Sequence, residues 1–67
     1  MKKWSDNLIE LSRDLLQIDG VNVKSIKGQF GKLNIEDKIY KISIKNTTDV
    51  LIFNSIDDII NSGWVVD

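Results

Sequence analysis

The side chains best suited to chemistry in this sequence are lysines gathered in its middle third. Residues 21–45 carry six lysines against two acidic side chains, whereas residues 46–67 carry four aspartates and no basic residue. The two segments therefore have net charges of +4 and −4, although the whole chain has a net charge of only −1. A local excess of lysine suits phosphate groups, but it is also ordinary on solvated strands, where it discourages edge-to-edge association.

The composition lacks the side chains that most often carry out catalysis. The chain contains no histidine and no cysteine, which removes the commonest general base, the thiolate nucleophile and the usual transition-metal ligands. Catalysis by paired carboxylates would need a concave pocket, and a domain of this size rarely encloses one of even ~300 Å³. We therefore expect no enzymatic activity, no metal site and no cofactor.

Residues 4–18 have the periodicity of an amphipathic helix. Apolar residues recur there at spacings of four, three, four and three, which returns each of them to one helix face. The predicted buried face consists of Trp4, Leu8, Leu11, Leu15 and Ile18. Ser5 or Asp6 is expected to cap the start of this helix, and Asp19-Gly20 to end it.

Residues 21–45 have the character of three strands joined by short turns. Tyr40, Ile42 and Ile44 alternate with polar residues and should face the core, as should Leu33 and Ile35. A two-residue turn at 36–37 would pair Leu33 with Tyr40, and one at 37–38 would pair it with Ile42, so the register stays open. The glycines of residues 28–31 predict the preceding turn, and an irregular alternation predicts a β-bulge near residues 24–25.

The C-terminal third should supply a strand and a second helix. Val50–Phe53 is a short apolar run, which predicts a buried strand, and Asn54-Ser55 should cap a two-turn helix with Ile56, Ile59 and Ile60 on its inner face. Gly63 should end that helix, leaving Trp64–Val66 as either a last strand or an anchor against the core. The predicted fold is α+β: one domain spanning residues 1–67, an α-β-β-β-β-α antiparallel meander with both helices on one face.

Strand alternation gathers a candidate partner-binding surface on the face of the sheet opposite the core. Phe30 falls on this face beside Lys32, and Ile39 shares it, so the two apolar residues could form a small exposed pair among lysines. The candidate residues are Phe30, Lys32, Ile39, Lys41 and Lys45. A half-buried turn position is the alternative interpretation of Phe30.

A second candidate surface lies on the first predicted helix. Asp6, Glu10 and Asp14 stand four residues apart on its outer face and form an acidic ridge suited to a basic partner. The sequence does not decide whether this acidic ridge or the lysine-bearing sheet is the functional surface.

These observations favour a small non-enzymatic interaction module that binds another protein. Nucleic-acid binding through the lysine-bearing meander is one alternative, and a homodimer formed by strand-edge pairing with a structural role is another. Eleven isoleucines, eight lysines and six asparagines indicate AT-rich codons, as in phage or mobile elements, where small inhibitor or immunity proteins occur.

We expect the protein to be cytoplasmic, with no membrane partner. The basic start at residues 1–3 is typical of a secretion signal, but Asp6, Glu10 and Arg13 interrupt any apolar stretch after it.

Overall fold

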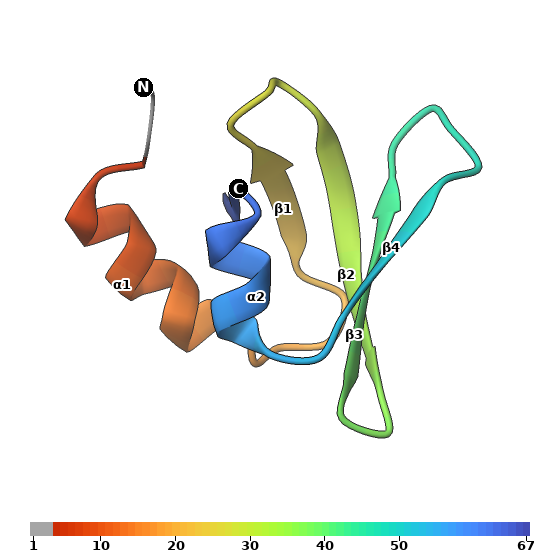
Figure 1. The fold of residues 1–67 in the computed structure, drawn as a ribbon, viewed down its shortest axis with the longest axis horizontal. Coiled ribbons are helices and arrows are strands. Elements are labelled where there is room, and N and C mark those ends of the chain that lie inside the picture. The colour runs from red at the N-terminus through yellow and green to blue at the C-terminus, as the bar shows by residue number, and fades with distance from the viewer. Residues whose placement is uncertain (1–3) are drawn as a thin grey trace.

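A computed structural model describes residues 4–67 as two helices and a five-stranded antiparallel sheet (Figure 1). The elements are α1 (Asp6–Leu15), β1 (Asn22–Ser25), β2 (Phe30–Glu36), β3 (Ile39–Ile44), β4 (Val50–Phe53), α2 (Ile56–Asn61) and β5 (Trp64–Val66). The predicted α+β class and element order are confirmed, and the C-terminal stretch is a strand. Residues 1–3, on which the secretion-signal argument drew, lie outside the described residues.

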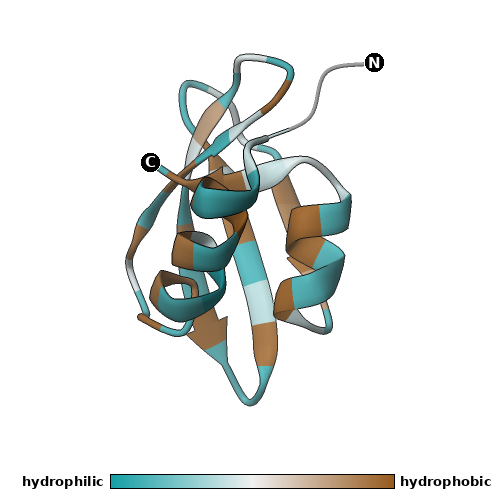
Figure 2. Ribbon diagram, turned by 90° about the vertical axis from the view of Figure 1, so that its left-hand side faces the viewer, coloured by the Kyte–Doolittle hydropathy of each residue, from teal (hydrophilic) through white to brown (hydrophobic). Residues whose placement is uncertain are grey.

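The sheet has the strand order β4-β3-β2-β1-β5, so the last strand lies beside the first. The chain makes a meander from β1 to β4 and then returns through α2 to pair β5 with β1. Both helices lie on one side of the meander in Figure 1, and the side view in Figure 2 shows them next to each other in front of the strands. The sheet therefore has one face covered by helices and one face turned away from them.

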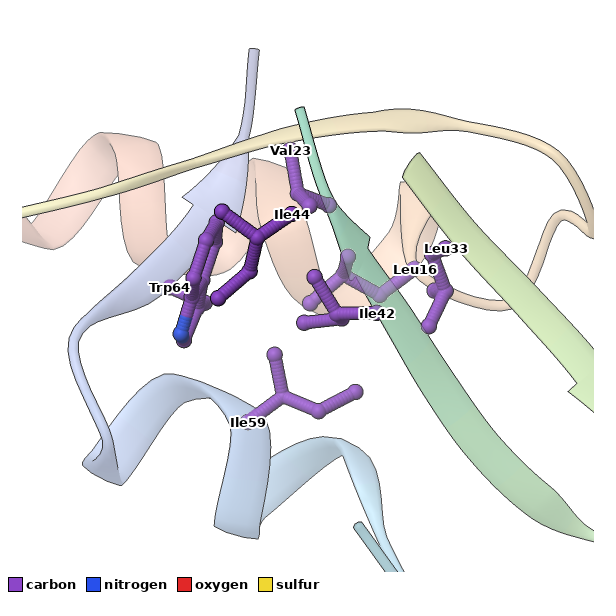
Figure 3. Packing of buried hydrophobic residues seen from close by; sticks show 7 residues of the cluster. All are labelled: Leu16, Val23, Leu33, Ile42, Ile44, Ile59 and Trp64. Atoms are coloured by element: carbon purple, nitrogen blue, oxygen red, sulfur yellow. The ribbon is translucent and has the colours of Figure 1, made fainter. Parts of the chain in front are cut away.

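The core lies between the helices and the covered face of the sheet, and Figure 3 shows its packing. As predicted, Ile42 and Ile44 point inward from β3, with Tyr40 packed at the border of the core. The buried cluster is Leu16, Val23, Leu33, Ile42, Ile44, Ile59 and Trp64. α2 contributes Ile59, and Ser55 caps its first turn by accepting a hydrogen bond from the Asp58 N–H at 3.2 Å.

The β2–β3 turn settles the register that the sequence leaves open. Asp37 and Lys38 occupy the turn with φ values of 48° and 66°, and Leu33 pairs with Ile42. Two successive positive φ angles are the signature of a type I′ turn, whose twist matches that of the strands. The sequence conceals this turn because it contains neither glycine nor asparagine.

The predicted β-bulge near residues 24–25 is wrong. β1 and β2 pair without interruption from Asn22 to Lys24, and β1 ends at Ser25. Ser25 points into the molecule, where its hydroxyl accepts hydrogen bonds from the N–H groups of Lys27 and Gln29 at 3.1 and 3.3 Å. Ser25 therefore occupies the inward position that strand alternation assigns to it, with no extra residue in β1, because the N–H groups of the following turn bond to its hydroxyl oxygen.

The predicted buried face of α1 is wrong in part, because the helix is rotated about its axis. Leu11 is 49% exposed and Ile18 is 54% exposed, whereas Ser12 and Leu16 are fully buried. Ser5 is the N-cap, as expected, but the helix ends at Leu15, before the predicted stop at residues 19–20.

A hydrogen bond explains the rotation of α1. The Val66 N–H of β5 donates to the Ser12 hydroxyl oxygen at 3.0 Å, across 54 residues of sequence. A buried N–H without an acceptor is costly, so the helix presents its serine to the sheet edge rather than Leu11.

Two substitutions test the orientation of α1. Ser12→Ala removes the acceptor of a buried N–H, and we expect a loss of about 1–3 kcal/mol in the free energy of unfolding. Leu11→Ala should cost at most about 1 kcal/mol, because half of the side chain is already exposed. Chemical denaturation monitored by tryptophan fluorescence measures both changes, and a larger loss for Leu11→Ala would contradict this orientation.

Trp64 offers a test of the core itself. It is 3% exposed and belongs to the buried cluster, so Trp64→Ala leaves a large cavity in a domain with little stability to spare. We expect destabilisation by about 3 kcal/mol or more, measured by thermal melting followed by circular dichroism. An unchanged melting temperature would contradict the described position of Trp64.

Candidate functional site

The face of the sheet turned away from the helices brings the sequence-predicted site residues together on one surface. We call this surface the lysine face. Its outward side chains are those of Asn22 and Lys24 on β1, Phe30, Lys32, Asn34 and Glu36 on β2, Ile39, Lys41 and Ser43 on β3, Val50 and Ile52 on β4, and Lys45 directly after β3. Leu33 and Ile42, one residue away on β2 and β3, point into the core, so strand alternation produces this separation.

Phe30 is the exposed aromatic group of the lysine face. It begins β2, pairs with Lys24 of β1, and its carbonyl accepts a hydrogen bond from the Lys45 N–H at 2.8 Å. The side chain is 51% exposed. One lysine therefore flanks Phe30 on each neighbouring strand, an arrangement that could hold an apolar side chain or an aromatic base beside negative charge.

Ile39 does not form the expected pair with Phe30. It lies opposite Glu36 at the far end of β2, six residues from Phe30, which places the two residues about 20 Å apart along the strand. The two residues share a face but cannot contact one small ligand group together. Both registers left open by the sequence place Ile39 near the turn, opposite Asn34 or Glu36, so the pairing of the strands already separates it from Phe30.

The four lysines of the lysine face differ in whether their ammonium groups lie close to an acidic or aromatic side chain. The Lys41 ammonium lies 3.4 Å from a Glu36 carboxylate oxygen, and the Lys24 ammonium lies 4.0 Å from an Asp67 oxygen and 5.4 Å from the centre of the Trp4 ring. Within residues 4–67, no ion pair involves Lys32 or Lys45. Lys32 lies two residues after Phe30 on β2, and the Lys45 backbone bonds to Phe30, so the lysines of this face without an ion pair are concentrated at that end.

Two exposed apolar residues of β4 extend the lysine face, and sequence analysis missed them. The prediction of a buried strand at Val50–Phe53 is wrong, because β4 is an edge strand with Val50 50% exposed and Ile52 64% exposed. An uninterrupted apolar run does not distinguish a strand buried on both faces from an edge strand. Only the strand order decides between them.

Other candidate sites in the described part of the chain have fewer features that could bind a ligand. A surface hollow of about 440 Å³ lies where α1, β3 and α2 meet, and Arg13 in its lining is already paired with Asp57. Across residues 4–67 no three acidic side chains converge in a way that could hold a metal ion. The acidic ridge of Asp6, Glu10 and Asp14 is solvent-exposed, and Arg13 lies within the same stretch of helix.

Comparison with protein-family models, with curated proteins and with solved structures finds no match. No helix within residues 4–67 is long and apolar enough to cross a membrane. The functional argument therefore depends on the geometry of the lysine face and of the sheet edges.

Gly31 fixes the part of β2 that presents Phe30 and Lys32. A Cβ at this position would lie 2.7 Å from the Ser43 carbonyl oxygen and 3.0 Å from the Ile42 side chain. Glycine therefore permits the close pairing of β2 with β3 at this point.

We expect Gly31→Ala to separate these strands locally and lower the free energy of unfolding by about 1–3 kcal/mol. Lys32→Ala, at the next and exposed position, should change it by no more than about 0.5 kcal/mol. Urea denaturation compares the two variants, and equal stabilities would show that the strands do not approach closely at Gly31.

Proposed function

We propose that this protein is a non-enzymatic binding module that docks an acidic surface of a partner protein on its lysine face. The observation that carries the proposal is the exposed Phe30, flanked by Lys32 and Lys45, whose charges no ion pair in residues 4–67 engages. An exposed aromatic group supplies apolar contact area at little cost in side-chain entropy, and nearby lysines steer an acidic partner toward it.

The distribution of charge supports an acidic partner. The lysines of residues 21–45 lie on the strands and turns of the meander, while the acidic residues of the C-terminal segment include Asp57 and Asp58 at the start of α2, on the other side of the sheet. A surface with an excess of positive charge raises the rate of encounter with an acidic partner and disfavours basic ones.

Nucleic-acid binding is the second candidate, and the same aromatic residue favours it. A base could stack on Phe30 while Lys32 and Lys45 contact flanking phosphates. The chain has a single arginine, Arg13, which lies on α1 and is paired with Asp57, so bidentate recognition of phosphate or guanine is not available on this face. The affinity of such a site would come from stacking and charge alone.

Charge reversal on the lysine face tests the proposal. Immobilised wild-type protein and a Lys32→Glu/Lys45→Glu variant are exposed to nuclease-treated host lysate, and proteins retained only by the wild type are identified and purified. Titration calorimetry should then show at least about tenfold weaker binding for the variant, because two attractive charges become repulsive.

Lys38→Glu/Lys27→Glu is the matched control, because it makes the same change in net charge in two turns outside the lysine face. Its affinity for the purified partner should remain within about twofold of the wild type. Equal weakening by both double variants would contradict a site at Phe30. Shifts of short DNA or RNA at low salt, abolished by Phe30→Ala, would instead support the nucleic-acid alternative.

A further inference from the structure

The two edges of the sheet differ in how much of them is covered by other elements. At the β5 edge, α1 lies alongside and the Ser12 hydroxyl accepts the Val66 N–H, and all of Trp64–Val66 is buried. At the β4 edge the outward side chains of Val50 and Ile52 are at least half exposed. One edge is therefore closed by a helix, and the other is open.

The open edge has a definite pattern of backbone groups. The Ile44 N–H donates to the Asp49 carbonyl at 3.1 Å, and the register continues with Ile42 opposite Leu51. In an antiparallel ladder, alternate residues turn their N–H and C=O groups to opposite sides. Asp49 and Leu51 therefore face β3, while Val50 and Ile52 direct their backbone groups away from the sheet.

Nothing in the described part of the chain blocks these groups. No turn, cap or side-chain hydrogen bond within residues 4–67 reaches the backbone of Val50 or Ile52. The strand Val50–Phe53 contains no charged residue, proline or bulge, whereas β1, β2 and β3 each carry a lysine. Charged residues, prolines and bulges are the usual means by which edge strands avoid pairing with another chain.

We propose that β4 pairs with β4 of a second copy of this chain, antiparallel and about a two-fold axis through Leu51. In this arrangement Val50 of each copy lies opposite Ile52 of the other, and each such pair exchanges two N–H···O=C bonds. All four outward N–H and C=O groups of each strand are then satisfied. The axis is perpendicular to the sheet, so the two five-stranded sheets join into one.

A second copy fits this edge because the strand is complementary to itself. Val50 and Ile52 form apolar cross-strand pairs on the outer face, and Leu51 meets its symmetry mate on the inner face. Like charges are not brought together, because Lys41 and its symmetry mate are separated by three strand spacings, about 14 Å. That distance exceeds the Debye length of about 8 Å at physiological ionic strength.

Pairing through β4 is independent of the proposed partner on the lysine face. It would, however, set the two lysine faces on the same side of the joined sheet, because Val50 and Ile52 of both copies share that side. A partner with two acidic sites could then engage both copies at once.

Sedimentation equilibrium of the full chain, from about 10 μM to about 1 mM, measures the association directly. We expect the wild type to pass from monomer to dimer over this range. Ile52→Pro removes an N–H that faces the open edge and spares the β3 ladder, so it should be folded by circular dichroism and monomeric throughout. A wild type that stays monomeric, or an Ile52→Pro variant that still dimerises, would overturn the proposal.

A second pair of variants keeps the test independent of proline. Ile52→Lys retains the N–H but places a charge at the dimer seam and should also be monomeric, whereas Ile39→Lys makes the same substitution elsewhere on the lysine face and should dimerise as the wild type does. Equal loss of dimer in both variants would argue for association through the face rather than the edge.

Disulfide trapping tests the register, since the chain has no native cysteine. Leu51→Cys places two thiols at the two-fold axis, where non-hydrogen-bonded partners lie about 4.5 Å apart between Cα atoms, within disulfide range. Ile52→Cys is the control, because its symmetry mate would lie about 8 Å away. Faster cross-linking of Leu51→Cys supports the axis at Leu51, and faster cross-linking of Ile52→Cys contradicts it.

Discussion

The hydrogen bond from the Val66 N–H to the Ser12 hydroxyl joins the two ends of the chain, and the architecture depends on this junction. A strand of three residues at a sheet edge has little stability of its own, and β5 is held because α1 lies against it and supplies an acceptor. Trp4 strengthens the same junction, since its indole N–H donates to the Gly63 carbonyl at 2.8 Å. With β5 in place, Trp64 reaches the core and β1 is flanked on both sides.

α1 covers the β5 edge of the sheet but not the β4 edge, so the two ends of the sheet offer different surfaces for binding. Both helices lie on one side of the sheet or at its β5 edge, where Trp4 lies near Lys24 and Val65 is fully buried. The rest of the lysine face and the edge of β4 keep exposed side chains, among them Phe30 and Ile52. The lysine face offers charge and one exposed aromatic group. The β4 edge offers unpaired backbone groups and apolar side chains. The two proposed surfaces offer different features for recognition, so the proposed partner protein and a second copy of the chain would not compete.

Several particular features could be read directly from the sequence because they depend on local periodicity. Alternation placed Ile42 and Ile44 in the core and Phe30 and Lys32 on the opposite face. Ser55 was identifiable as a helix cap because a serine followed by two aspartates suits a helix N-terminus. Other features could not be predicted from local periodicity. The register of β2 against β3 stayed open because the second position of the type I′ turn is Lys38, a residue type without a preference for positive φ, where glycine is usual.

The sequence by itself determined the α+β class, the order of elements from α1 to α2 and the division of the meander into an apolar and a lysine-bearing face. These features follow from the repeat of apolar residues every 3.6 positions in a helix and every two in a strand, which is a local property. The tertiary structure decided the rotation of α1 and the edge position of β4. Each of these depends on which segments become neighbours. Ser12 is buried because a distant backbone N–H needs an acceptor, and Ile52 is exposed because no strand follows β4 in the sheet.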